Sequence, residues 1–268
     1  MMKILVSPSF SLFLSLLLSS ALAEEFVSDS EIFVDLTHPF DSETIYWPTE
    51  PGFSLDVESA GVTDKGYFYA SNRFATAEHG GTHIDAPIHF YADRETVDQI
   101  PLGRLIGPAV CVDVSHRCAA DRDYLISVED LQKWESQTDK SLEKKIVLLR
   151  TGYGQYWPNR EKYLGTAATG REAVSLLHFP GLDPVAAEWL VSKRNIRAVG
   201  IDTASIDPGQ SDTFGSHINL CRANIPALEN VANLDQLPEH GFTILALPMK
   251  IAGGSGAPCR IVAIMRGQ

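Results

Sequence analysis

Three histidines and one aspartate fall within eleven consecutive residues of this chain, at His79, His83, Asp85 and His89. The other five of its eight histidines are spread over the rest of the 268 residues. Neutral imidazole nitrogens and a carboxylate oxygen are the ligands that borderline divalent ions prefer, and a catalytic metal site keeps one coordination position open for water. The spacing therefore predicts a metal site within residues 79–89.

The same segment contains residues that shape the backbone. Gly80 and Gly81 allow unusual backbone angles and close approach of other groups, and Pro87 stiffens the far side. We therefore expect a tight, non-helical turn to hold the ligands. A histidine-rich surface loop, or histidines that only satisfy hydrogen bonds in the core, is the alternative interpretation for any single one of these residues.

The predicted site suits metal-assisted hydrolysis. A divalent ion lowers the pKa of bound water to about 7 and polarises a carbonyl group. Histidine, with an unperturbed pKa near 6.5, can take a proton and return it to a leaving group. The sequence contains no Gly-x-Ser-x-Gly elbow, no P-loop and no dinucleotide-binding glycine motif, so serine-hydrolase and nucleotide chemistry are not expected.

The segment carries the complete motif H-x-G-T-H-x-D-x-P-x-H, from His79 to His89. In this it resembles the cyclase-like metal hydrolases, which include bacterial kynurenine formamidase and isatin hydrolase. Similar segments flank the motif in the same order, at residues 34–39, 46–48, 201–207, 216–217 and 225–230. The resemblance covers almost all of residues 32–265.

This resemblance implies a swivelling β/β/α fold and a metal, Mn²⁺ or Zn²⁺, held by His79, His83 and Asp85. Isatin hydrolase-like members add a glutamine oxygen, which Gln210 matches. Formamidase-like members instead hold a second zinc with residues that match His217 and Glu229. Because this chain has all three residues, the number of metal ions stays open, and Gln210 favours the isatin hydrolase-like branch with one manganese.

The resemblance also bears on the proton shuttle and on the function. His89 matches a position that is not a ligand, which makes it the candidate proton shuttle. Independently of the resemblance, the aromatic side chain of Trp47 is a candidate contact for an aromatic substrate, with packing in the core as the alternative. The favoured function is hydrolysis of a cyclic or aryl amide of a small molecule. An arylformamidase that acts on N-formylkynurenine and a non-catalytic exported metal- or ligand-binding protein are the alternatives. The resemblance also suggests a homodimer or a higher oligomer.

The elements that position these residues are short. Turn-bounded β-type runs occur at residues 32–36, 67–77, 109–114, 146–150, 198–201, 242–247 and 260–265. Ser127 and Asp130 mark the start of a helix, and Asp183 followed by Pro184 marks another that ends near Asn195. The order of strands and helices predicts a mixed α/β fold.

Residues 1–23 have the features of a cleaved export signal, with Lys3 before an apolar run and Ala21 and Ala23 at the expected cleavage site. Residues 24–268 then form one domain, which we expect to be secreted and to have no membrane segment. The net charge of −12 argues against nucleic acid as a partner. Whether Cys111 and Cys118 form a disulfide or are buried thiols stays open, as does the state of Cys221 and Cys259.

Overall fold

The computed structural model describes residues 31–267, and the predicted export signal lies outside them. By its internal contacts the chain divides into two units. Residues 33–265 form one unit, and it contains every residue that the sequence marks as functional. The other consists of residues 1–32 and 266–268, of which only 31, 32, 266 and 267 are described.

The principal sheet has eight strands, and seven of them close into a ring in the order β12-β11-β5-β7-β9-β10-β4, because β4 pairs back with β12. The eighth strand, β1, lies next to β12. Ring closure leaves these seven strands without an open edge. The strands are β1 (Glu31–Asp35), β4 (His83–Asp85), β5 (Ile106–Asp113), β7 (Ile146–Arg150), β9 (Ala198–Ile201), β10 (Ala227–Glu229), β11 (His240–Pro248) and β12 (Gly256–Arg266).

Apolar side chains cover both faces of the central strands. On β7, Leu148 belongs to a core cluster that takes alternate residues from all strands of the ring, such as Ile84 and Ile261. Leu149 points the other way, into a second cluster formed with the helices. Strands that are buried on both faces read as continuous apolar runs, which is why residues 109–112 and 146–149 lack alternation.

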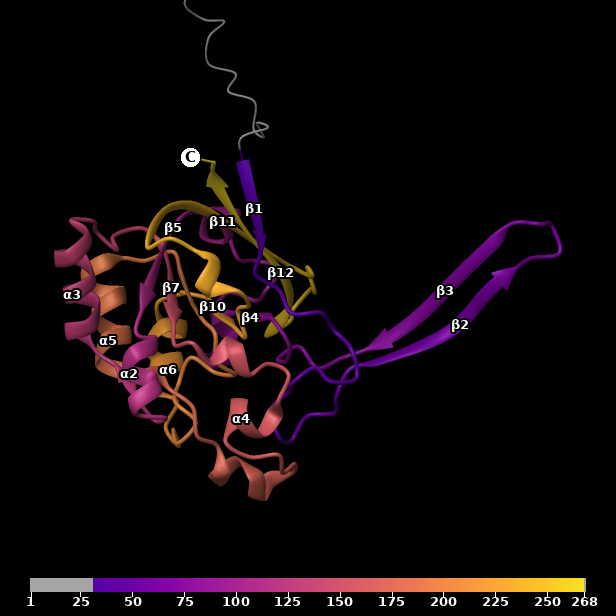
Figure 1. The fold of residues 1–268 in the computed structure, drawn as a ribbon, viewed down its shortest axis with the longest axis horizontal. Helices are drawn as coiled ribbons and strands as arrows, with labels where there is room; N and C mark the ends of the chain where they lie inside the picture. Colours follow the sequence, from indigo (N-terminus) through magenta and orange to yellow (C-terminus); the bar gives the residue numbers. More distant parts are fainter. Residues whose placement is uncertain (1–30, 268) are drawn as a thin grey trace, which may run out of the picture. The chain divides into compact units, whose positions relative to one another are not determined.

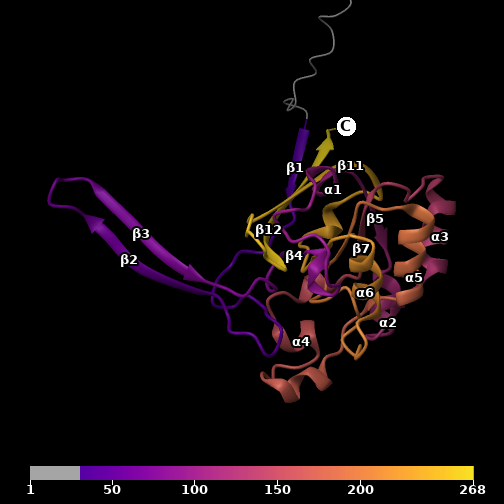
Figure 2. The ribbon, with the colours of Figure 1, turned by 180° about the vertical axis from the view of Figure 1, so that it is seen from behind.

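Helices pack on the outside of the ring, where α3, α5 and α6 lie near one another (Figures 1 and 2). The helices are α1 (Leu102–Leu105), α2 (Ser115–Ala120), α3 (Val128–Thr138), α4 (Arg160–Leu164), α5 (Pro184–Trp189) and α6 (Gly215–Arg222). Single helical turns follow at η1 (Pro87–His89), η2 (Tyr153–Tyr156), η3 (Arg171–Leu176), η4 (Leu190–Arg194) and η5 (Leu234–Gln236). A two-stranded sheet of β6 (Leu125–Ile126) and β8 (Gly181–Leu182) completes this part.

The local start signals of the two predicted helices are confirmed. Ser127 accepts a hydrogen bond from the Asp130 amide and Asp130 accepts one from the Ser127 amide, which is a capping box. The Asp183 side chain caps α5, and Asn195 ends the following turn with a left-handed backbone. The mixed α/β class is confirmed as well, whereas the swivelling β/β/α description stays an expectation from the resemblance.

All four cysteines are free and buried. Cys111 and Cys118 are therefore buried thiols and do not form a disulfide with each other. Burial raises the pKa of Cys118 to about 12 and that of Cys221 to about 11. Among residues 31–267, no helix is long and apolar enough to cross a bilayer.

Strands β2 (Ser54–Val62) and β3 (Phe68–Ala75) form an antiparallel hairpin that extends away from the rest of its unit (Figures 1 and 2). Neither strand packs extensively on any other described helix or strand. The sequence predicts β3 but not β2, because the polar and small residues of β2 interrupt the β-type pattern.

Candidate metal centre and its cavity

Strand β4 carries two of the predicted ligands on one face. Side chains alternate along a strand, so His83 and Asp85 point the same way while Ile84 enters the core. Strand β10 runs antiparallel beside β4 and places Glu229 directly opposite His83. Two three-residue strands therefore bring a histidine and two carboxylates to one spot, and all three side chains are buried.

The two glycines before β4 have the roles that the sequence predicts. A Cβ atom on Gly80 would overlap the Tyr46 ring, and Gly81 has a φ of 56°, in the left-handed region that favours glycine. The Gly81 carbonyl oxygen accepts hydrogen bonds from His83 Nδ1 and from the Asn230 amide. The turn thus fixes the orientation of the His83 ring.

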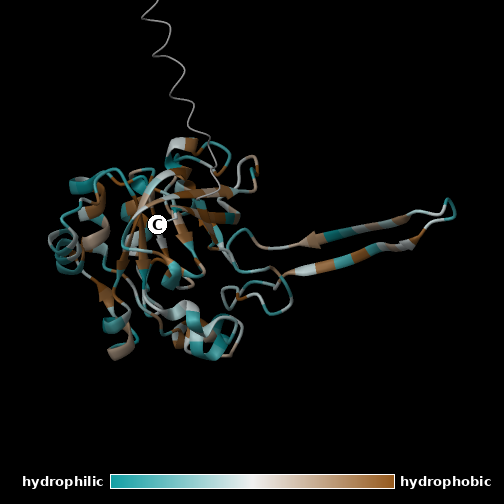
Figure 3. Cartoon of the chain, turned by 45° about the horizontal axis from the view of Figure 1, so that its top comes forward, coloured by the Kyte–Doolittle hydropathy of each residue, from teal (hydrophilic) through white to brown (hydrophobic). Residues whose placement is uncertain are grey.

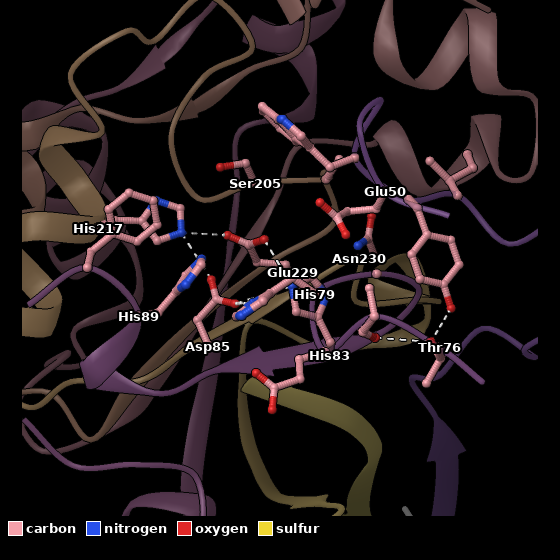
Figure 4. Close-up of a pocket in the computed structure, with 18 of the residues that line it drawn as sticks. Glu50, Thr76, His79, His83, Asp85, His89, Ser205, His217, Glu229 and Asn230 are labelled. Carbon is pink, nitrogen blue, oxygen red and sulfur yellow. Dashed lines mark hydrogen bonds and ion pairs between the residues drawn. The ribbon is translucent and has the colours of Figure 1, made fainter. Parts of the chain in front are cut away.

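Asp85 is the centre of the cluster, as Figure 4 shows. Its Oδ1 lies 2.6 Å from His79 Nδ1 and 3.3 Å from His83 Nε2, and its Oδ2 lies 3.0 Å from His217 Nε2. Glu229 closes the group, at 3.4 Å from His83 Nε2 and 3.2 Å from His217 Nε2. One carboxylate therefore contacts three histidines that come from a loop, a strand and a helix.

His217 reaches the cluster from the first turn of α6, and Asp207 holds it there. The Asp207 carboxylate accepts hydrogen bonds from the amides of Ser216 and His217, each at 3.0 Å, and from His217 Nδ1 at 2.6 Å. This contact leaves Nε2 of His217 pointing at Asp85 and Glu229. A histidine whose second nitrogen is bound by a carboxylate is a common arrangement around metal ions.

The donor set fits a divalent cation. His83 Nδ1 donates to the Gly81 carbonyl, so in the neutral ring Nε2 carries the lone pair that a metal ion would bind. That buried Nε2 has no hydrogen-bond partner among the described residues. Two groups of three residues each bring their ligand atoms within 4.8 Å of one another, and Asp85 belongs to both groups. The first group adds His79 and His89, and the second adds His83 and Glu229. The residues can therefore hold one ion or two.

The charges of the cluster also favour a cation. Burial alone would lower the pKa of His83, but Asp85 and Glu229 outweigh it and raise that pKa to about 10. Burial likewise opposes ionisation of Asp85, yet His79 and His217 hold the pKa of this carboxyl well below its usual range. Buried carboxylates therefore create a negative potential at His83 Nε2, and such a potential attracts a metal ion.

His79 and His89 lie next to each other at the edge of the cluster. Their rings stack with centroids 3.7 Å apart, and His79 Nε2 lies 2.9 Å from the hydroxyl of Ser255. Glu78 in turn accepts a hydrogen bond from that hydroxyl. Burial is the main cause that lowers the pKa of His89 to about 4. His89 thus faces the cavity as a neutral imidazole at pH 7.

The cluster forms one wall of a cavity of about 570 Å³, within the size range of small-molecule sites. Aromatic rings line much of it, from Tyr46, Trp47, Phe90 and Phe214. Trp47 thus lies where the sequence predicts a substrate contact. Four carboxyl groups line the same cavity, whereas no lysine or arginine of residues 31–267 does.

The structure does not bring Gln210 to this site. Its amide nitrogen donates to the Leu177 carbonyl and lies 3.5 Å from His178 Nε2, and the residue is exposed. Gly209 packs against the backbone of residues 177–178, and its amide donates to the Phe179 carbonyl. Gln210 is not among the residues that line the cavity beside Asp85, so this arrangement offers no support for the predicted glutamine ligand.

The sequence does not assign a role to Asp207, although it marks residues 201–207 as similar to the family. Three hydrogen bonds to α6 make Asp207 the residue that orients His217. No local signal points to this role, because Asp207 lies ten residues before His217 and a loop separates them. The structure does bring together His79, His83, Asp85, His89, His217 and Glu229.

Comparisons with known proteins agree with this geometry. A family model described as a putative cyclase matches residues 34–208. The isatin hydrolase of Roseibium aggregatum is 30% identical over 92% of this chain and 96% of its own length. The kynurenine formamidase of Bacillus cytotoxicus is 29% identical over 86% and 96%.

Among solved structures, isatin hydrolase A from Labrenzia aggregata, bound to benzyl benzoate, superposes with a TM-score of 0.79. It shares 32% sequence identity, and the match covers 88% of this chain and 94% of that one. The matched family model includes the 79–89 motif and β4, and the relatives span nearly the whole chain. This chain therefore belongs to the cyclase family.

Proposed function

We propose that this chain is an exported, metal-dependent hydrolase that opens the C–N bond of a small cyclic amide, as an isatin hydrolase does. The observation that carries the proposal is the convergence of His79, His83, Asp85, His217 and Glu229 on the wall of an aromatic-lined cavity. Buried carboxylates and imidazoles cost stability unless they are paired or bind an ion. Their accumulation beside a cavity is typical of a catalytic site.

In this proposal His79, His83 and Asp85 hold a manganese or zinc ion, with His217 and Glu229 beside it. The bound ion would supply Lewis-acid activation of water and of the substrate carbonyl. Asp207 and the Gly81 carbonyl orient His217 and His83, so that the ligand nitrogens are in place before the ion binds. Such preorganisation strengthens metal binding.

His89 is the proposed proton shuttle. It lines the cavity and stacks on His79. The ion pairs of Asp85 are with His79, His83 and His217. When water attacks the amide carbonyl carbon, His89 takes a proton from that water. It then gives this proton to the amide nitrogen as the C–N bond breaks, which yields a carboxylic acid and an amine. The acid releases its remaining proton to solvent at pH 7.

The cavity favours a neutral substrate over one with a carboxylate. Glu50, Glu78, Asp85 and Glu229 line it, and among the described residues no lysine or arginine does. Isatin, a neutral and planar cyclic amide, suits aromatic walls such as Trp47. N-formylkynurenine carries a carboxylate that would need a cationic partner, so the arylformamidase remains the second candidate on the strength of the formamidase relatives.

The experiment is an assay of the purified protein after treatment with a chelator and reloading with Mn²⁺ or Zn²⁺. Isatin and N-formylkynurenine are tested side by side, and we expect metal-dependent ring opening of isatin with the higher kcat/KM. A higher kcat/KM for N-formylkynurenine would make the chain an arylformamidase. Tight metal binding without turnover of any cyclic or aryl amide would support the non-catalytic binding protein.

Export is the second part of the proposal and rests on residues 1–23 alone. Mass spectrometry of the protein recovered outside the cell should find an N-terminus at or near Glu24. A membrane-bound species that retains Met1 would contradict the cleaved signal.

A further inference from the structure

The loop that follows β9, residues 202–208, is tied to the metal centre at two points. The Ile206 amide donates a hydrogen bond to Glu229 Oε1 at 2.7 Å. The Asp207 carboxylate accepts one from His217 Nδ1 at 2.6 Å. These two contacts fix the position of the loop beside the metal-binding side chains, so any other polar group of the loop has a defined place as well.

Ser205 is the residue of this loop whose hydrogen-bonding capacity is incompletely used. Its Oγ accepts a hydrogen bond from the Asp207 amide at 3.2 Å, and its carbonyl oxygen accepts one from the Thr203 hydroxyl at 2.8 Å. In the described part of the chain, no atom accepts a hydrogen bond from the Ser205 hydroxyl. The residue is only 4% exposed. A buried donor without an acceptor is destabilising, so this hydroxyl needs an acceptor from another source.

That source lies in the substrate cavity. Ser205 and Ala204 line the cavity together with Trp47. In the view of Figure 4, Ser205 lies on the other side of the Glu229 carboxylate from Asp85. Figure 3 shows that the strands of the ring carry mostly apolar side chains, so a buried hydroxyl with a free donor stands out in these surroundings. Ser205 thus belongs to the cavity wall beside the metal-binding side chains.

The carboxylates of the cavity cannot replace this hydroxyl as a donor. Asp85 and Glu229 contact histidines, and Glu78 accepts a hydrogen bond from the Ser255 hydroxyl. A carboxylate oxygen only accepts hydrogen bonds, whereas a hydroxyl can donate one to a carbonyl oxygen. Ser205 therefore supplies what a neutral carbonyl group needs in this cavity.

We propose that the Ser205 hydroxyl donates a hydrogen bond to a second carbonyl oxygen of the substrate, next to the amide that is cleaved. Ser205 would thereby select cyclic amides that carry two adjacent carbonyl groups. The inference rests on the proposed function, in which the carbonyl of the cleaved amide lies at the metal centre. Because Ser205 directly precedes Ile206, whose amide contacts Glu229, its hydroxyl is placed for the neighbouring group of the substrate ring.

Specificity follows from the cost of an unpaired donor. A substrate with a methylene group in place of the second carbonyl leaves the Ser205 hydroxyl without an acceptor. A site that is built to hydrogen-bond a polar group rejects an analogue without that group more strongly than an apolar pocket rejects a change of size. Discrimination between such analogues is therefore the property that Ser205 should control.

The test is the binding of two inert ligands to the manganese-loaded protein, measured by isothermal titration calorimetry. Indane-1,2-dione has the two adjacent carbonyl groups of isatin, and indan-2-one has only the one that corresponds to the amide carbonyl. Neither contains a C–N bond, so neither can be hydrolysed. We expect Ser205→Ala to raise the Kd of the dione by about 10-fold and that of indan-2-one by less than about 2-fold, the effect of one lost neutral hydrogen bond.

Ser141→Ala is the matched control. Ser141 Oγ accepts a hydrogen bond from the amide two residues later, at 3.0 Å, as Ser205 Oγ does, but Ser141 does not line the cavity. Both Kd values should equal those of the wild type in this variant. Elemental analysis checks that Ser205→Ala retains its manganese.

Three results would overturn the proposal. An equal rise of both Kd values in Ser205→Ala would give Ser205 a structural role only, and unchanged values would mean that its hydroxyl binds water. Failure of the wild type to bind the dione would exclude the contact altogether.

The isatin assay separates this inference from the proposed function. A wild type that prefers the dione through Ser205 but does not open isatin would contradict the proposed function and leave the Ser205 contact standing. A wild type that opens isatin while Ser205→Ala binds both ligands unchanged would overturn the contact alone.

Discussion

The cluster around Asp85 and the β2–β3 hairpin depart from the usual burial rule in opposite directions. Asp85, Glu229 and Asp207 are charged residues in the interior, whereas Val62 and Phe68 are apolar residues in water. These buried carboxylates pair with three histidines of the same chain, His79, His83 and His217. Val62 and Phe68 lie opposite each other, and their strands do not pack extensively on any other described element.

This difference shows which groups find interaction partners within the described part of the chain. The cluster is held by short contacts from several elements, so losing one member leaves an unpaired buried group. The hairpin is held mainly by its own backbone pairing, so a substitution there leaves the rest of the chain intact. Equivalent substitutions in the two regions should therefore have very different effects.

The largest contrast is expected between Asp85→Ala and Asp56→Ala. Removal of Asp85 takes away the carboxylate that contacts three histidines, so metal content should fall to background. Activity should fall by about 10³ or more, because a metal ion contributes several kcal/mol to catalysis. Elemental analysis and the isatin assay measure both, and Asp56→Ala on β2 should match the wild type. Wild-type metal content in Asp85→Ala would refute the site.

The next contrast lies within the cluster and separates a ligand from a proton shuttle. His83→Ala should lose metal and activity together. His89→Ala should keep the metal while kcat falls by roughly 10²–10⁴, the usual contribution of general acid–base catalysis.

Elemental analysis beside single-turnover kinetics distinguishes the two histidines. If His89→Ala empties the site, His89 is a ligand, as its place in one of the two ligand groups allows. An unchanged rate would mean that another group moves the proton.

A smaller effect is expected from Asp207→Asn. Asparagine has one acceptor oxygen where Asp207 has two, so it cannot accept from both α6 amides and from His217 Nδ1, and it carries no negative charge beside His217. Metal affinity should weaken by about 10- to 100-fold, as for other residues that orient a metal-binding histidine. Competitive metal titration measures this, and Asp64→Asn, between β2 and β3, is the control. Unchanged affinity in Asp207→Asn would show that Asp207 does not contribute to metal binding through His217.

The smallest contrast compares two glycines. An alanine Cβ at Gly80 would overlap the Tyr46 ring, so Gly80→Ala should lower the free energy of unfolding by about 1–3 kcal/mol. At Gly61, on β2, an alanine Cβ would have no heavy atom within 4 Å, and alanine suits a strand better than glycine by about 0.5–1 kcal/mol. Urea titration of both variants provides the measurement. Equal destabilisation would show that Tyr46 moves aside without cost.

Much of the candidate site follows from local sequence. Residues 79–89 predict a turn and its ligands because the glycines, histidines and Asp85 act within a few residues of one another. The capping box at Ser127 is predictable for the same reason. Strands β4 and β10 are not, because each has only three residues and exists through pairing with strands distant in the sequence.

The sequence by itself thus determined the candidate ligand motif of residues 79–89 and the mixed α/β class, since these depend on short-range patterns. The export signal stays a prediction. Only the tertiary structure decided that Glu229 lies opposite His83, that Asp207 orients His217 and that Gln210 contacts Leu177 and His178. It also decided that the hairpin leaves an apolar face exposed. The physical reason is that strand register and burial are set by contacts between residues far apart in the chain, which no local pattern records.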